Sequence, residues 1–165
     1  MDLSVIINSI QAAINSAPIT ASPSIAVKKS FQEALSEGLT RRLRYVKKGG
    51  IEYKLSNVLT DSHNGFNDKC DIFVETERYI LIVELDTTRA DQVAKKMLSR
   101  LYYADKCAKP TIYVCLLYPG TNSMNPNECV KYMHMGKDVL LSMNSANRFI
   151  GGFINGNSFD LKLIV

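Results

Sequence analysis

The sequence predicts an α/β domain with a mixed central sheet and helices on both faces, and three observations support this. Residues 69–86, KCDIFVETERYILIVELD, hold two apolar runs that meet at Thr76-Glu77, as in a hairpin at the centre of a sheet. An amphipathic pattern then leads to a further apolar run, TIYVCLLYP, so the strands on either side of that helix should pair in parallel. With 165 residues, 46% hydrophobic and 22% charged, the chain has the size and composition of one folded domain over residues 1–165.

Two amphipathic helices are expected before the sheet. Apolar residues recur at helical spacing over residues 3–15 and predict the first helix, which could cover the sheet or form an interface between two copies. After the Pro/Ser segment at 16–24, SIAVKKSFQEALSEG begins with a Pro-Ser start signal and predicts a second helix that ends at Gly38.

The segment RRLRYVKKGGIEYK, at residues 41–54, predicts a strongly basic hairpin that turns at Gly49-Gly50. A polar loop follows and leads to the central hairpin. A crossover helix of about 16 residues is expected after that hairpin, starting at Thr88 with Asp91 as a capping-box partner. Its apolar face consists of Val93, Ala94, Met97, Leu98 and Leu101.

The C-terminal part, residues 127–165, is expected to form a helix followed by a hairpin. The helix should span about residues 127–142, and the hairpin should turn at Asn155-Gly156.

Composition and cysteine spacing limit the classes of protein. No apolar run reaches the roughly 18 to 20 residues of a membrane span, and the first segment lacks the basic start of a secretory signal. The four cysteines are widely spaced, so neither a zinc site nor a disulfide framework is indicated. We therefore expect a cytoplasmic protein without a membrane partner. Its net charge of +4 permits a polyanionic partner without requiring one.

Carboxylate residues lie at the open end of the central hairpin, away from its turn. The turn at Thr76-Glu77 predicts a register in which Asp71 lies opposite Ile82 and Lys69 lies opposite Glu84. Because side chains alternate along a strand, Lys69, Asp71, Glu84 and Asp86 would then share one face. Like charges beside a buried strand need compensation, and Mg²⁺ takes such oxygen ligands. Alternatively, Glu84 pairs with Lys69, and Asp86 lies near the positive end of the following helix.

This order of parts resembles the PD-(D/E)XK nuclease superfamily, which has a restriction-endonuclease-like core. That family has a helix with an acidic residue, a hairpin, a strand with Asp, a strand ending in Glu-x-Lys, a crossover helix and another strand. The resemblance covers about residues 24–118. Asp71 in KCDIFV matches the family's Asp, and Glu84 in IVELD matches its second acid.

The helices carry further matches. Glu33 or Glu37 in FQEALSEG matches the helix acid of some members. Gln92 lies early on the crossover helix, where many members carry a Gln or a basic residue that faces the site. The departure is Asp86, which occupies the place of the family's lysine.

Three consequences of Asp86 stay open. The resulting E-x-D site could still bind metal and activate water, as in some restriction endonucleases of this kind. Alternatively, the lysine has moved, with Lys69 the best-placed substitute and Lys95 or Lys96 on the helix less well placed. In the third case the site is inactive, and the fold persists as a module that binds nucleic acid or a partner protein.

The resemblance implies a metal-dependent endonuclease that hydrolyses phosphodiester bonds, in DNA rather than RNA. Mg²⁺ or Mn²⁺ would be held by Asp71, Glu84, Asp86 and the Leu85 carbonyl, and Lys69 would donate to the phosphate. Many nucleases of this fold dimerise to cut both strands, so a homodimer is a further expectation.

Basic residues on the first hairpin and the crossover helix are candidates for phosphate contacts. On the helix they recur at spacings of seven and four, opposite the apolar face. The candidates are Arg41, Arg42, Arg44, Lys47, Lys48, Arg89, Lys96 and Arg100.

Overall fold

The fold is given by a computed structural model, which describes residues 3–16, 25–57, 68–119, 123, 125–155 and 158–160. Its elements, in chain order, are α1 (Leu3–Ser16), α2 (Ile25–Arg42), β1 (Val46–Lys54), a 3₁₀ turn (Leu55–Asn57), β2 (Lys69–Thr76), β3 (Ile80–Thr87), α3 (Ala90–Lys106), β4 (Thr111–Tyr118), α4 (Pro126–Met143), β5 (Arg148–Asn155) and β6 (Ser158–Asp160).

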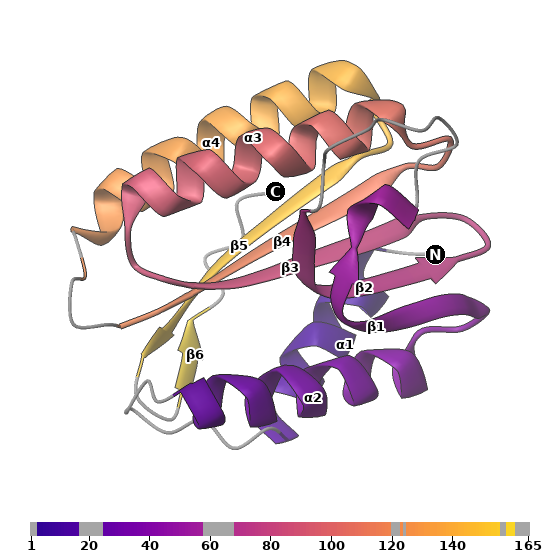
Figure 1. The fold of residues 1–165 in the computed structure, drawn as a ribbon, viewed down its shortest axis with the longest axis horizontal. Coiled ribbons are helices and arrows are strands. Elements are labelled where there is room, and N and C mark those ends of the chain that lie inside the picture. Colours follow the sequence, from indigo (N-terminus) through magenta and orange to yellow (C-terminus); the bar gives the residue numbers. More distant parts are fainter. Residues whose placement is uncertain are drawn as a thin grey trace.

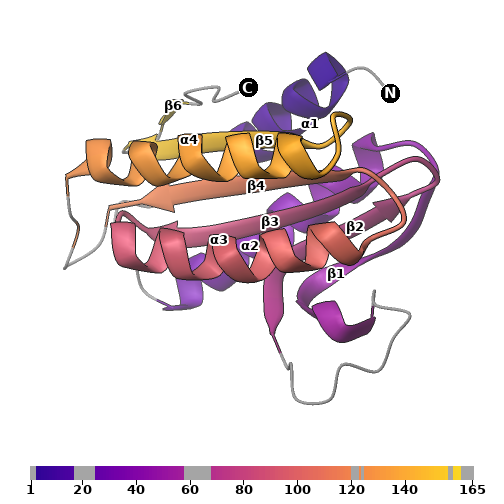
Figure 2. The ribbon, with the colours of Figure 1, turned by 90° about the horizontal axis from the view of Figure 1, so that it is seen from above.

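Within the described residues, six strands form one mixed sheet in the order β1-β2-β3-β4-β5-β6. The pairs β3–β4 and β4–β5 are parallel, and the other pairs are antiparallel. Helices α3 and α4 cover one face, and α1 and α2 lie on the other (Figure 1; Figure 2 gives the view from above). The predicted α/β class, with a mixed sheet between helices, is therefore confirmed, as is the parallel pairing across α3.

Each face of the sheet has its own apolar core. On one side Ile6 and Ile10 of α1, with Leu35 and Leu39 of α2, pack against strand residues such as Val83. On the other side the buried faces of α3 and α4 pack against the sheet through residues that include Met97, Met133 and Phe149. Full burial of one such side chain stabilises the fold by about 1.5 to 3 kcal/mol. The apolar face of α1 is thus used to cover the sheet.

The predicted basic hairpin at residues 41–54 is wrong. Helix α2 continues through Gly38 to Arg42, and β1 is a single strand that contains both Gly49 and Gly50. These two glycines pair with Val74 and Phe73 of β2. The ladder with β2 outweighs the local turn preference of a Gly-Gly pair, because an extended glycine can satisfy both of its backbone groups there.

The crossover helix spans the predicted region but starts differently. Its N-cap is Arg89, which makes no side-chain capping hydrogen bond. The predicted cap, Thr88, instead donates its hydroxyl to the Tyr118 carbonyl at 3.1 Å and so ties the start of α3 to the end of β4. None of the described helices is long and apolar enough to cross a membrane.

The C-terminal predictions are confirmed in their main features. Helix α4 includes the predicted residues 127–142, and β5 pairs with β6 in the antiparallel sense of a hairpin. Gly156 in the predicted turn, and the loop that carries His63, lie outside the described residues.

The predicted register of the central hairpin is wrong by two residues. Phe73, not Asp71, lies opposite Ile82, and Lys69 lies opposite Lys54 of β1. The reason is the turn, which is longer than predicted. Thr76 closes it, since its Oγ1 donates to the Tyr79 carbonyl at 3.0 Å.

Candidate active site

The candidate site lies where the ladder between β2 and β3 ends. The last recorded pair is Ile72 with Val83. One step further, the Leu85 N–H donates to Asp71 Oδ2 at 2.7 Å, so a carboxylate takes the place of a backbone acceptor. The same register places Asp71 opposite Glu84, where the sequence predicted Lys69. Both side chains are buried, with Glu84 1% exposed and Asp71 6% exposed.

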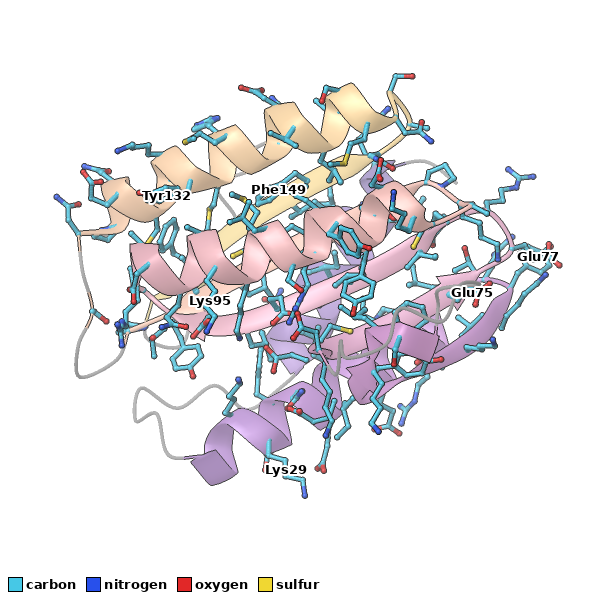
Figure 3. All side chains as sticks on the ribbon, turned by 45° about the horizontal axis from the view of Figure 1, so that its top comes forward. Lys29, Glu75, Glu77, Lys95, Tyr132 and Phe149 are labelled. Atoms are coloured by element: carbon cyan, nitrogen blue, oxygen red, sulfur yellow. The ribbon has the colours of Figure 1, made fainter. Side chains whose placement is uncertain are left out.

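Lys96 of α3 joins three carboxylates. Its Nζ lies 3.1 Å from Asp86 Oδ2, 3.2 Å from Glu84 Oε2 and 3.8 Å from Asp71 Oδ2. Figure 3 labels its neighbour Lys95, which marks the part of α3 above this end of β3. We call Asp71, Glu84 and Asp86 the acid cluster.

Arg100, one helical turn after Lys96, binds the other side of Glu84. Its Nε donates to Glu84 Oε1 at 2.6 Å, and its Nη2 donates to the Lys69 carbonyl at 2.7 Å. The side chain is only 5% exposed. A buried guanidinium with this geometry fixes Glu84 and the start of β2 relative to α3.

Helix α2 approaches the acid cluster from the opposite face of the sheet. Lys28 Nζ lies 3.2 Å from Asp71 Oδ1. Gln32 Nε2 donates to the Asp71 carbonyl at 2.5 Å and to Glu52 Oε1 at 3.3 Å. Asp71 is therefore held by cations from two helices on different faces of the sheet.

Glu52 extends the row of acids onto β1. Residues Ile51 and Tyr53 pair with Ile72 and Cys70, so Glu52 stands at the level of Asp71. Its φ of 47° lies in the left-handed region, which residues other than glycine adopt only at a cost in energy.

Burial and charge act against each other on Glu84. Burial raises its pKa to about 7, because the loss of hydration outweighs the attraction of Arg100 and Lys96. For Lys96, burial lowers the pKa, but the carboxylates of Glu84, Asp71 and Asp86 outweigh it and raise the pKa above its ordinary value. Lys96 is therefore a stable cation, while Glu84 changes its charge near neutral pH.

The structure brings together Asp71, Glu84 and Asp86 of the predicted site, but the lysine at their centre is Lys96. The Lys69 side chain is exposed, and only its backbone carbonyl contacts the network.

The helix residues predicted for the site lie elsewhere. Glu33 forms an exposed ion pair with Lys29, and Glu37 does so with Arg41. Gln92 donates to Asp91 at 3.3 Å, on the exposed side of α3.

Three further residues of the site, Lys28, Gln32 and Glu52, were not predicted from the sequence. The spacing of Lys28 and Gln32, four residues apart on α2, matches that of Lys96 and Arg100 on α3, so each helix presents two polar residues on one line. This spacing can be read from the sequence. It indicates a contact with Asp71 only once the pairing of β1 with β2 is known.

The basic residues predicted to lie opposite the apolar face of the crossover helix have partners within the protein. Arg100 is buried, Lys96 is held by the acid cluster, and Arg89 pairs with Asp91 through an Nη2–Oδ2 distance of 2.6 Å. Lys47 and Lys48 do lie exposed on β1.

A divalent cation fits the chemistry of these residues, although no group of three or more His, Cys, Asp or Glu side chains in the described part of the chain lies close enough to hold one by itself. Mg²⁺ needs fewer protein ligands, because it keeps several waters and binds through one or two carboxylates. Asp71 and Glu84 provide such a pair. Asp86 Oδ2 adds a further buried oxygen, which faces the Lys96 ammonium at 3.1 Å.

No family model matches this chain, and neither a curated protein nor a solved structure gives a match to it.

Proposed function

We propose that this protein is a Mg²⁺-dependent nuclease that hydrolyses phosphodiester bonds, with DNA favoured over RNA as its substrate. One observation carries the proposal: Asp71, Glu84 and Lys96 converge where β2 and β3 stop pairing. Two acids and a lysine are the residue types of the PD-(D/E)XK motif, with the lysine supplied here by α3. The order α2, β1, β2, β3, α3, β4 also supports a restriction-endonuclease-like core.

In this proposal Asp71 and Glu84 hold the Mg²⁺, and Asp86 assists as a third oxygen donor. Bound Mg²⁺ supplies Lewis-acid polarisation of the phosphoryl group and lowers the pKa of water. Lys96 donates to a phosphate oxygen as a point charge, since its raised pKa keeps it protonated. Arg100 positions Glu84, and Gln32 positions Asp71, through the hydrogen bonds described above.

A substrate phosphate would compete with the acid cluster for Lys96. The ammonium is held by three carboxylates, none of them closer than 3.1 Å. A cation bound to Asp71 and Glu84 would weaken that hold, because it neutralises the same carboxylates. Substrate and cation binding should therefore assist one another.

The test is cleavage of plasmid and single-stranded DNA in Mg²⁺ or Mn²⁺, run beside EDTA. We expect Asp71→Asn, Glu84→Gln and Lys96→Gln to reduce the rate by at least about 100-fold each, in line with the loss of a positioned acid–base or charge-stabilising group. Lys95→Gln is the matched control, because it removes the same charge from an exposed neighbour on α3. Equal rates for Lys95→Gln and Lys96→Gln would contradict the proposal.

A second function is favoured by the charge balance of the site. Lys28, Lys96 and Arg100 neutralise Asp71, Glu84 and Asp86 without a metal. Such a balanced network suits a non-catalytic module that binds nucleic acid. DNA binding without cleavage of any substrate, and without a rise in melting temperature on addition of Mg²⁺, would favour this second function.

A further inference from the structure

A second cluster of charged residues lies at the other end of the β2–β3 hairpin. There the turn between the strands, the end of α2 and the segment before β1 border an open cavity of about 470 Å³. It is lined by Val5, Arg42, Arg44, Tyr45, Thr76, Glu77, Arg78 and Tyr79, and we call it the arginine cavity. Glu77 stands at one end of the molecule in Figure 3, well away from Lys95 on α3.

The cavity has an excess of positive charge. Its lining includes Arg42, Arg44 and Arg78 but one acid, Glu77. All three arginines are exposed, and none has an ion-pair partner among the residues that the structure describes. Guanidinium groups that line one cavity without an ion-pair partner are suited to a phosphate, which they can bind in a bidentate manner.

Tyr45 adds an aromatic surface to the cavity. Its side chain is 71% exposed, and its φ of 61° lies in the left-handed region. This conformation costs a residue with a Cβ about 1 to 2 kcal/mol relative to glycine. A strained backbone that presents an exposed ring beside arginines is arranged for stacking, and an unpaired base stacks on such a ring.

Positive charge continues from the cavity towards the acid cluster. The edge strand β1 carries the exposed residues Lys47, Lys48 and Lys54, and Lys54 pairs with the exposed Lys69. Five residue steps along β2 separate Thr76 from Asp71, which corresponds to about 17 Å. At the roughly 3.4 Å per nucleotide of a stacked strand this distance corresponds to about five phosphates, and a more extended single strand spans it with fewer.

We propose that the arginine cavity binds single-stranded nucleic acid, with a backbone phosphate between the arginines and an unpaired base on the ring of Tyr45. The strand then follows β1 towards the acid cluster. This site does not require the acid cluster to be catalytic, because it uses different residues and a different kind of contact.

The test is fluorescence anisotropy of a labelled ten-nucleotide thymidine strand with the full chain in EDTA, at several salt concentrations. We expect Arg44→Gln/Arg78→Gln to weaken binding by at least about tenfold and to reduce the salt slope by about 1.4, the value for two phosphate contacts with a single strand. Lys106→Gln/Lys131→Gln is the control, since it removes two exposed charges from α3 and α4. Equal losses in the two double variants would overturn the proposal.

Tyr45 variants test the stacking part. Tyr45→Gly should weaken binding by roughly 5- to 150-fold, as expected for the loss of one base–aromatic stack, while Tyr45→Phe should bind like the wild type. A melting temperature for Tyr45→Gly at or above that of the wild type would separate lost binding from lost folding. Unchanged affinity of Tyr45→Gly would overturn the proposal, as would duplex DNA or thymidine monophosphate binding as tightly as the strand. Because EDTA prevents metal-dependent cleavage, a failure here is distinguishable from a failure of the proposed catalysis.

Discussion

The two ends of the β2–β3 hairpin carry charge in opposite ways. In the acid cluster the carboxylates of Asp71 and Glu84 are buried, and each has basic partners from the helices. In the arginine cavity Arg44 and Arg78 are exposed and have no ion-pair partner in the described part of the chain. A buried charge must be paired inside the protein. An exposed charge needs no partner, because water solvates it, and it is therefore available to bind a ligand.

This comparison predicts very different costs for the loss of one arginine. We expect Arg100→Ala to lower the free energy of unfolding by about 3 to 5 kcal/mol, because Glu84 would lose its partner in a buried site. Arg78→Ala should change it by about 0.5 kcal/mol or less, as for an exposed surface residue. Urea denaturation at pH 8 measures both.

A double variant checks the cause of the first effect. Glu84→Gln added to Arg100→Ala should restore part of the lost stability, since it removes the charge that Arg100 neutralised. The effects of the two substitutions could instead be additive, so that Glu84→Gln lowers the free energy of unfolding equally in the wild type and in Arg100→Ala. The two residues would then not be coupled, and the predicted difference between the two ends of the hairpin would be contradicted.

The stability of the protein should also depend on pH through the titration of Glu84. Its pKa of about 7 in the folded protein lies above the ordinary value of 4.5, so the folded state binds the proton more tightly than the unfolded chain does. The resulting stabilisation is fully present below pH 4.5 and is lost as the pH rises through 7, a change of about 3 kcal/mol in metal-free buffer.

Comparison with Glu84→Gln isolates this contribution, because the other titrating groups are common to both proteins. We expect the stability of the wild type relative to the variant to fall between pH 5 and pH 8. A difference that stays constant over this range would mean that Glu84 is already ionised at pH 5 and that Arg100 and Lys96 outweigh its burial.

A small gain in stability is expected from one substitution in the arginine cavity. Tyr45→Gly should raise the free energy of unfolding by about 1 kcal/mol, because glycine adopts a positive φ without the cost that a Cβ imposes. Thermal unfolding of Tyr45→Gly beside Tyr45→Ala measures this, since alanine removes the ring but keeps the Cβ. Equal stability of the two variants would mean that φ strain is not stored at this position.

Local sequence patterns were sufficient to predict the layered α/β class, the central hairpin and the parallel pairing across α3, because apolar periodicity records which faces of each element are buried. It also identified Asp71, Glu84 and Asp86 as neighbours, since carboxylates that end buried strands stand out from their surroundings.

Long-range pairing could not be predicted from local patterns. The Gly49-Gly50 pair favoured a turn, but its ladder with β2 made it part of a strand. The three-residue turn after Thr76 shifted the β2–β3 register by two and moved Lys69 away from Glu84. A shift of two residues keeps every side chain on its predicted face, so the hydrophobic pattern could not reveal it.

The packing of the helices on the sheet determines which cations contact the carboxylates. Lys28 and Gln32 on α2, and Lys96 and Arg100 on α3, are helical residues that local sequence reasoning assigns to solvent or to phosphate contacts. They become part of the site because helices on opposite faces pack over the open end of the same two strands. The free energy of pairing a buried charge depends on the positions of its partners, which here lie on helices distant in sequence. The sequence around Asp71 and Glu84 does not contain that information.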